Sequence, residues 1–593
     1  MRWNWYIGVI VGCLAASSAS AQLRIVNYNV AGLNGDTNAM RDVFAALNDD
    51  DKPGFAVAPA LYVFQEVHSS DVAALGNLLN QASPPGISYT QGTYTSFCPG
   101  IGTDASGAQA MFYRADLLTE DVSGHLDIFT GASRCSDRWK LDLVGYDSPD
   151  ASFYIYSSHL KASTGGSNEQ VRLTGAMAIR DNADALGPGK HIIYAGDMNV
   201  YNAAEPAYLE FLSSGTGQAL DPLGTGTWSG SNNAIKHTQA PCNGTCSLVG
   251  GGMDDRFDLQ LSTGAFQDGS GLSLMSGVYR SLGNDGLHYD QSINTGNNSY
   301  YPSDIPRSNA LADDLFVASD HIPVVGEYQV PAVLTAELVS DVGRVIQGAA
   351  VSVEAEISND AVVVVANGAD ALDYTAAGDG AVTGMVSGSV AALAGPAVVE
   401  LDVDTSVVGV VSGSIAITST SQAAQNAPAS LPVSGEVVRP ANASFSSGSD
   451  ESATVVAVEL DVDSGVQTIE VPVYNRGFDE NQALLDVDSV DGLGGLFGLC
   501  GSLPTGVELG GGVVCLTFDT TGLSTGDYGT SVTINTSDED IPGEGQGALF
   551  LTIEIELGQP SVPEASRWGQ GLGLVLVLSA GWLAMGRSGR TAL

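Results

Sequence analysis

The chain is poor in positive charge. Lysine and arginine supply 22 of its 593 residues against 67 aspartates and glutamates, which gives a net charge of −45 at pH 7. Within residues 22–331 the balance is 15 Lys/Arg against 34 Asp/Glu, or 15 − 34 = −19. This scarcity excludes the basic surface normal for nucleic-acid binders, so phosphate backbones are repelled unless salt or divalent cations screen the charge. Adaptation to salty water, where charge maintains solubility, is the simpler interpretation.

The start of the chain lacks an apolar run long enough for a membrane span. It has an Arg near the first residue, a short apolar middle, and Ala19-Ser20-Ala21 before Gln22. This order is typical of a secretory signal peptide, which we place at residues 1–21. We therefore expect an exported protein.

The end of the chain combines a short apolar run with positive charge. "VPEASRW" precedes "GQGLGLVLVLSAGWLAMG", and Arg587 and Arg590 follow. Residues 559–593 resemble the PEP-CTERM class of bacterial sorting tails, except that Ala565 stands where the motif has a second proline. A plain C-terminal membrane anchor is the alternative. Both interpretations predict association with the cell surface or extracellular matrix.

Cysteine is also scarce, and Cys13 leaves with the signal peptide. An even number of remaining cysteines in an exported protein favours disulfides. Nearness in sequence predicts three pairs: Cys98–Cys135, Cys242–Cys246 and Cys500–Cys515. Six cysteines allow about 15 pairings. For "CNGTC" the alternatives are free thiols or half of a zinc site, but a second Cys/His pair at suitable spacing is missing.

Helix signals are nearly absent from residues 335–557, which are rich in Val, Ala, Gly, Ser, Thr and Asp. Alternating stretches such as "VVSGSIAITSTS" predict antiparallel strands. A weak repeat relates residues 410–437 to residues 527–555. We therefore predict two tandem Ig-like β-sandwich domains, at 332–440 and 441–558, which serve as a stalk or as interaction modules.

Residues 22–331 mix strands with helices. Four apolar stretches predict buried strands: "LRIVNYNV", "ALYVFQEV", "FYIYSSHL" and "HIIYAGDM". A helical pattern at 168–186 lies between the last two of these strands, and a short helix is expected at 205–215.

Polar side chains gather where these strands end. In "GDMN" the side chains of Asp197 and Asn199 face the same spot, because residues i and i+2 of an extended segment point the same way. Isolated, this stretch is also typical of a strand-capping turn. The other strand-end motifs supply Asn29, Glu66, His159, Asp255, Arg256, Asp258, Asp320 and His321.

These residue types suit the hydrolysis of a phosphodiester. Glu66 offers hard carboxylate oxygen for Mg²⁺, with Asn29 and Asp320 as further ligands. His321 is the predicted base for water, with Asp258 holding its ring in preference to Asp255.

The remaining groups face the phosphate in this interpretation. Asp197 orients the attacking water, Asn199 donates to a phosphate oxygen, and His159 is a second donor or an acid. Arg256, and His288 in the loop "GNDGLHYD", are predicted substrate contacts. For that loop a glycine-rich turn is an equal alternative.

The order N, QE, H, GDxN, DRxD and SDH resembles the endonuclease/exonuclease/phosphatase superfamily, over residues 24–328. The resemblance implies an α/β four-layer sandwich, two packed β-sheets flanked by helices, with the site at one edge and the roles given above. Abasic-site endonucleases of that superfamily carry Asp where Ala31 stands and Tyr where His159 stands. The chain therefore looks more like the DNase I and sphingomyelinase branches.

Three functions follow as hypotheses. The first is a secreted phosphodiesterase that depends on Mg²⁺, or on Mn²⁺ or Ca²⁺, and in its leading form it is a nuclease acting on extracellular nucleic acid. The second is a phospholipase C- or sphingomyelinase-like enzyme, or a phosphatase of small phosphoesters. The third is an adhesion protein with an inactive nuclease-like domain. None of these requires an obligate protein partner.

Overall fold

The computed structural model describes residues 22–49, 55–104, 107–132 and 134–559. The predicted signal peptide, and the predicted tail apart from residue 559, lie outside these residues. The chain divides into two compact units, one ending at Val437 and one beginning at Val438. The first unit contains an α/β region (residues 22–331) and a β-sandwich (residues 332–437, the first sandwich). The second unit contains another β-sandwich (residues 438–558, the second sandwich).

The α/β region is built on two seven-stranded sheets. The first sheet has the order β14 (Ser273–Leu274), β16 (Val324–Gln329), β1 (Leu23–Asn29), β2 (Leu61–Val67), β6 (Ala108–Tyr113) and β3 (Thr90–Gln91), with β15 (Arg280–Ser281) also paired to β16. The second has the order β12 (Ala219–Leu220), β13 (Asp258–Thr263), β11 (Ile192–Asp197), β10 (Ser152–His159), β9 (Cys135–Leu143) and β7 (Leu118–Glu120), with β8 (Leu126–Phe129) paired to β9. A small hairpin joins β4 (Phe97–Cys98) to β5 (Gly102–Thr103).

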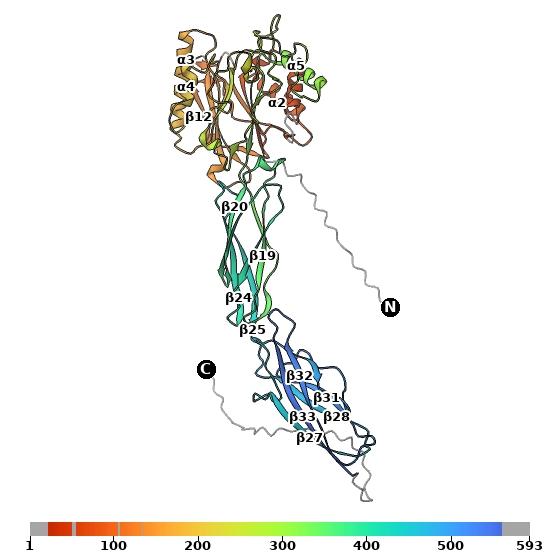
Figure 1. Ribbon diagram of the computed structural model, residues 1–593. Coiled ribbons are helices and arrows are strands. Elements are labelled where there is room, and N and C mark those ends of the chain that lie inside the picture. Colours follow the sequence, from red (N-terminus) through yellow and green to blue (C-terminus); the bar gives the residue numbers. More distant parts are fainter. Residues whose placement is uncertain (1–21, 50–54, 105–106, 133, 560–593) are drawn as a thin grey trace, which may run out of the picture. The chain divides into compact units, whose positions relative to one another are not determined.

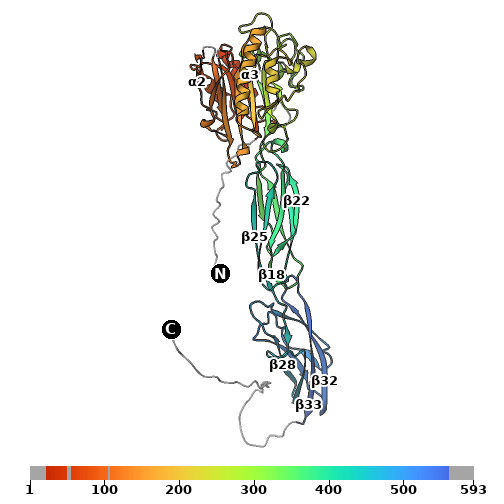
Figure 2. The same ribbon diagram turned by 90° about the vertical axis from the view of Figure 1, so that its left-hand side faces the viewer.

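The two sheets pack face to face, and helices cover their outer faces. Ile25 and Val63 of the first sheet meet Trp139 and Ile155 of the second in one buried cluster. Helices α1 (Thr37–Ala46), α2 (Val72–Ala82) and α5 (Ile305–Ala318) cover the first sheet, and α3 (Gly166–Asp184) and α4 (Pro206–Leu212) cover the second. In Figure 1 α2 and α5 lie on the opposite side of the region from α3 and α4, and in Figure 2 α3 lies in front of its sheet. The region is therefore an α/β sandwich of four layers.

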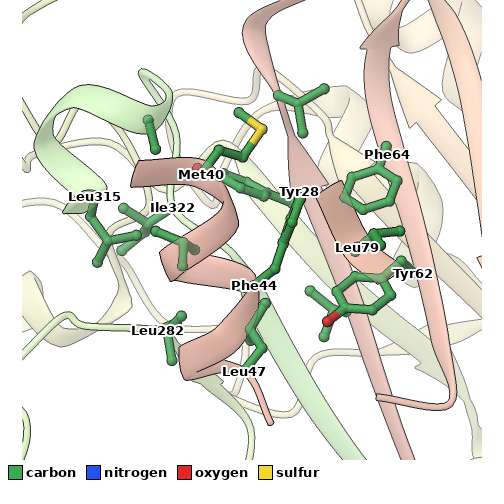
Figure 3. Close-up of a cluster of buried hydrophobic side chains, with 14 of the residues drawn as sticks. Tyr28, Met40, Phe44, Leu47, Tyr62, Phe64, Leu79, Leu282, Leu315 and Ile322 are labelled. Carbon is green, nitrogen blue, oxygen red and sulfur yellow. The ribbon is translucent and has the colours of Figure 1, made fainter. Parts of the chain in front are cut away.

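The central strands are apolar on both faces because both faces are covered. On β1, Ile25 points between the sheets, whereas Val26 and Tyr28 belong to the outer cluster. Figure 3 shows that outer cluster, where Met40 and Phe44 of α1 pack against aromatic rings of the first sheet. Phe44 meets Tyr28 edge-on, with ring centroids 6.4 Å apart. Continuous apolar runs thus hold the strands rigidly, which fixes the positions of the polar residues at their ends.

The first sandwich consists of a four-stranded and a five-stranded sheet around one apolar core. The sheets have the orders β17 (Leu334–Leu338), β19 (Ser352–Asn359), β23 (Ala397–Val403), β21 (Val382–Thr383), and β18 (Gly343–Ile346), β25 (Ala429–Val438), β24 (Gly409–Ser419), β20 (Leu372–Gly380), β22 (Met385–Val390).

The first sandwich also packs against the α/β region. Its residues Val363 and Ala369 are buried in the cluster that fills the space between the two α/β sheets. The backbone N–H of Gly271 donates to Asp370 over 2.8 Å, and the amide of Gln425 bonds to Asp147. The predicted boundary at 331/332 therefore lies inside a compact unit.

The second sandwich consists of two four-stranded sheets. The orders are β26 (Ala443–Ser444), β28 (Val466–Asn475), β31 (Gly512–Asp519), β30 (Phe497–Leu499), and β27 (Ala453–Asp461), β33 (Gln546–Gly558), β32 (Gly526–Asp538), β29 (Leu485–Asp491). The stretches predicted to form antiparallel strands, in β24 and β28, do pair antiparallel, whereas β27 and β33 pair in parallel. Alternation of polar and apolar residues has the same period for both directions and does not distinguish them. No helix in the described part of the chain is long and apolar enough to cross a membrane.

Candidate active site

Six chain segments deliver polar side chains to one edge of the α/β sandwich. Strands β1 and β2 run parallel and bring Asn29 and Glu66 to that edge. Strands β10 and β11 run parallel in the other sheet, and their last residues, His159 and Asp197, are register partners. Asp258, the first residue of β13, pairs with Asp197 in turn. His321 comes from the segment before β16.

The side chains form one connected cluster around Asp197. Oδ2 of Asp197 lies 3.2 Å from Nε2 of His159, 3.2 Å from Nδ2 of Asn29 and 3.6 Å from Nε2 of His321. Oε1 of Glu66 lies 3.2 Å from Nδ2 of Asn29 and 3.5 Å from Nδ1 of His159. Residues separated by as many as 292 positions in sequence thus share one site.

Two backbone features allow this approach. Gly196 has φ +123°, and a Cβ there would lie 2.1 Å from the carbonyl oxygen of Ser158, so only glycine fits between β10 and β11 at this point. At Glu66 the pairing of β2 with β6 shifts register, and φ is +59°. Such a bulge turns a side chain out of the regular alternation, here toward the site.

Asp258 orients the ring of His321. Its Oδ2 lies 2.7 Å from Nδ1 of His321, and both side chains are buried. In the neutral ring the carboxylate at Nδ1 accepts the Nδ1 proton, and Nε2 then carries the lone pair that faces the cluster. Asp255 does not make this contact, which resolves the alternative between the two aspartates in favour of Asp258.

The electrostatics of the buried groups differ. Burial alone would lower the pKa of His321, but the carboxylates of Asp258, Asp197 and Asp320 outweigh it and raise that pKa well above its usual value. Burial, with the positive charges of Arg134 and His321, lowers the pKa of His159. Burial also raises the pKa of Asp197 to about 7. His321 is thus the stronger proton acceptor, while His159 is held neutral.

Glu66 is the group best placed to hold a divalent cation. Its side chain is 30 % exposed, whereas that of Asp197 is 3 % exposed. Magnesium is commonly held by one or two carboxylates together with several waters. The Asn29 amide lies beside Glu66, and Asp320 contributes negative charge near His321. The donors therefore fit a hydrated Mg²⁺, although no cluster of three or more His, Cys, Asp or Glu side chains suited to a metal occurs among the described residues.

Asn199 completes the strand-end group. Its backbone N–H donates to Oδ1 of Asp197 over 3.0 Å, and its Nδ2 donates to the carbonyl of Leu160 over 3.3 Å. The turn that the isolated motif indicates is therefore present. Asn199 has φ +50°, so the segment is not extended at this residue as predicted, and its side-chain amide bonds to Leu160 and not to the cluster.

The structure does not bring Arg256 or His288 to the cluster, which corrects both predicted substrate contacts. Arg256 is 1 % exposed and forms two hydrogen bonds to Asp221, at 2.6 and 2.9 Å. His288 is buried, with Nδ1 2.9 Å from Asp285 and Nε2 3.0 Å from the carbonyl of Thr295. Buried polar groups need internal partners, and these two side chains fulfil that need.

Sequence patterns missed two residues at the site, Gln239 and Arg134. Nε2 of Gln239 lies 2.9 Å from Nε2 of His321. Arg134 is half-buried, donates to the carbonyl of Leu160 over 3.4 Å, and affects the pKa of both His159 and Asp197. Neither residue belongs to a strand-end motif. The one signal for Arg134 is its position next to Cys135.

The structure contains three disulfides, Cys98–Cys135, Cys242–Cys246 and Cys500–Cys515. These are the pairs that nearness in sequence favours. The first ties the β4–β5 hairpin to the start of β9, one residue from Arg134.

No protein-family model matches the chain, and no curated protein matches it. Among solved structures, the chain is similar to truncated TDP2 of Caenorhabditis elegans, with 15 % identity over 52 % of this chain and 97 % of that one and a TM-score of 0.32.

Two further structures show a similar level of likeness. The human Nocturnin catalytic domain with a bound sulfate anion is 15 % identical, over 53 % of this chain and 96 % of that one, with a TM-score of 0.31. A Bacteroides vulgatus endonuclease/exonuclease/phosphatase is 13 % identical, over 52 % of this chain and 99 % of that one, with a TM-score of 0.32. Likenesses at this level of identity and TM-score do not show what activity the chain has.

Proposed function

We propose that the α/β region is a divalent-metal-assisted phosphodiester hydrolase. The observation that carries this proposal is the arrangement around His321. Asp258 holds Nδ1, and Nε2 faces Asp197 and Asn29 beside the carboxylate of Glu66, which is 30 % exposed. A buried base, an orienting carboxylate and a reachable metal ligand are the parts that hydrolysis of a phosphoester requires.

The chain's own residues accept the proton of the attacking water and stabilise the negative charge that grows on the phosphoryl oxygens. His321 accepts a proton at Nε2 from a water molecule that Asp197 orients, and the water oxygen bonds to phosphorus as the bond to the leaving oxygen breaks. His159 and Arg134 donate hydrogen bonds to phosphoryl oxygens, where negative charge grows. Glu66, Asn29 and Asp320 would hold Mg²⁺, which when bound polarises a phosphoryl oxygen and stabilises the leaving group.

In the leading form of this proposal the protein is a nuclease acting outside the cell, so nucleic acid is the first substrate to test. Export rests on the signal-like residues 1–21, and retention at a cell surface rests on the tail-like residues 559–593. In this proposal divalent ions of the medium screen the negative surface.

A specific observation favours small phosphoesters as the second candidate. Most arginines of the α/β region form contacts inside the protein. Arg24, Arg172 and Arg180 are at most 1 % exposed and are bonded to carboxylates or backbone carbonyls. Arg134, at the site, is the exception that best suits a single phosphate. A polyanion needs many phosphate contacts, whereas a lipid headgroup or sugar phosphate needs one.

The test is hydrolysis by the chain from residue 22 onward, with Mg²⁺, Mn²⁺ or Ca²⁺, of plasmid DNA, phosphatidylcholine and a chromogenic phosphodiester. His321→Ala should lower kcat on the order of 10³-fold, because it removes the base. His288→Ala is the matched control, since His288 also pairs with an aspartate but lies outside the cluster. It should lower the melting temperature and leave kcat of the folded protein within about threefold.

Each result has a definite meaning. Nicking of plasmid that His321→Ala abolishes supports the nuclease, and release of phosphocholine without nicking supports the second candidate. Metal binding without turnover of any phosphoester would refute the proposal and favour an inactive adhesion protein.

A further inference from the structure

Gln239 covers the nitrogen atom of His321 that the proposed reaction uses. Its Nε2 lies 2.9 Å from Nε2 of His321. When the ring of His321 is neutral and Nδ1–H is donated to Asp258, Nε2 is the acceptor and the Gln239 amide is the donor. The amide of Gln239 therefore occupies the position from which a water or a phosphoryl oxygen would approach His321.

The backbone fixes Gln239 in this position. It forms isolated bridges with both Asp255 and His321. The backbone N–H groups of Asp254 and Asp255 donate to its carbonyl, over 3.2 and 3.1 Å, and its own N–H donates to Asp255. The side chain therefore starts from a defined point, and only its amide end needs to move when another molecule binds.

Gln239 also lies on the open side of the cluster. Three side-chain atoms surround Nε2 of His321, from Asn29, Asp197 and Gln239. Asn29 is 0 % and Asp197 2 % exposed, whereas Gln239 is half-buried. Of the three residues that surround Nε2, Gln239 is thus the one that solvent reaches most easily.

We propose that Gln239 is a further catalytic residue, whose amide exchanges its hydrogen bond to His321 for one to the scissile phosphoryl group. This inference rests on the proposed function of the same site. A neutral amide N–H suits the role, because its hydrogen bond to a phosphoryl oxygen strengthens as negative charge develops there. The exchange also frees Nε2 of His321 to accept the proton of the attacking water.

The test uses Gln239→Met, which keeps the approximate length and volume of the side chain and removes both donors. With Mg²⁺ and a chromogenic phosphodiester, kcat should fall on the order of 10²-fold while KM stays within about threefold. The dissociation constant of inorganic phosphate, measured by calorimetry, should rise about tenfold. Gln291→Met, in an exposed position of a neighbouring loop, is the matched control and should change neither value.

A second pair of variants separates contact with phosphate from positioning of His321. If Gln239 touches phosphate, Gln239→Met should weaken phosphate binding equally in the wild-type and His321→Ala backgrounds. Loss of the effect in the His321→Ala background would overturn the inference and leave Gln239 as a positioning residue. Melting temperatures within about 2 °C establish that both variants are folded.

The binding measurement keeps this inference separable from the proposed function. Unchanged kcat and unchanged phosphate affinity in Gln239→Met would overturn the inference while the wild-type turnover upholds the function. If the wild type turns over no phosphoester but Gln239→Met still weakens phosphate binding, the function fails and the contact stands. A wild type that neither turns over a phosphoester nor binds phosphate overturns both.

Discussion

The α/β region and the two sandwiches differ in whether their charged side chains are buried or exposed. The α/β region buries many charged side chains, among them Arg24, Arg256, Asp197 and Asp258, each at most 2 % exposed. In the described part of the sandwiches, Asp538 is the only buried charged residue, and it is 4 % exposed. Its carboxylate accepts backbone N–H groups of Ala441 and Gly545, the second over 2.9 Å.

The arginines show the same contrast. In the sandwiches, the ion pairs are made by Arg344, Arg439 and Arg476. The side chains of these arginines are 30 %, 44 % and 32 % exposed, respectively. In the α/β region, Arg24 and Glu327 form an ion pair in which both side chains are 0 % exposed. Exposed pairs contribute little to stability, and buried ones are costly unless fully bonded. Buried charge is therefore concentrated in the region that contains the candidate active site, and the sandwiches rely on alternating apolar strands.

Removal of metal should have the largest effect on turnover, and the effect should depend on the α/β region and not on the sandwiches. A chelator should reduce turnover to background, because Glu66 then lacks the ion that it is proposed to hold. Glu66→Gln should lower kcat on the order of 10³-fold at saturating substrate, since metal assistance supplies several kcal/mol. The check is steady-state kinetics across Mg²⁺ concentrations, beside Glu459→Gln on an exposed strand of the second sandwich. Equal losses in both variants would contradict the assignment of Glu66.

Truncation should lower the melting temperature by an amount that depends on which sandwich is removed, and this effect ranks second in size. Removing residues 332–558 exposes the part of the inter-sheet cluster that Val363 and Ala369 cover, and returning one fully buried valine to water costs about 1.5–3 kcal/mol. Removing only residues 438–558 leaves the first compact unit whole. Calorimetry should show a lower melting temperature for the first truncation alone. The same melting temperature in both would mean that the first sandwich does not support the α/β region.

The smallest effect expected is on the pH dependence of the unfolding free energy, to which Asp137 of the α/β region contributes. Asp137 is 2 % exposed, its Oδ2 has no hydrogen-bond partner, and Asp127 lies directly opposite it on β8. Burial, with the charges of Asp127 and Asp104, raises the pKa of Asp137 well above its usual value. The folded state thus binds the proton more tightly than the unfolded state. The stability this contributes is complete below the unfolded pKa and is lost as pH rises through the folded pKa.

Asp137→Asn should remove that dependence. Between pH 4 and pH 8, the unfolding free energy of the variant should fall less than that of the wild type. Chemical denaturation at the two pH values measures it, with Asp486→Asn in the second sandwich as the control. Parallel pH profiles for Asp137→Asn and the wild type would show that Asp137 is charged in the folded protein.

Much of the architecture could be predicted from local sequence. Apolar runs such as those ending at Asn29 and Asp197 predict buried strands, because covered strands exclude polar groups from both faces. The polar residues at their ends predict a site, because parallel neighbours end at one edge. The direction of β27 relative to β33 could not be predicted, since alternation is the same in both cases.

The sequence by itself determined which segments form strands and which polar residues stand at their ends, because these depend on near neighbours along the chain. Tertiary structure alone decided the contacts between them. It set Asp258 rather than Asp255 against His321, placed Gln239 over the free nitrogen of that ring, and kept Arg256 inside the protein. These contacts join residues 35 to 82 positions apart, and they depend on strand register, bulges and burial, which local patterns do not encode.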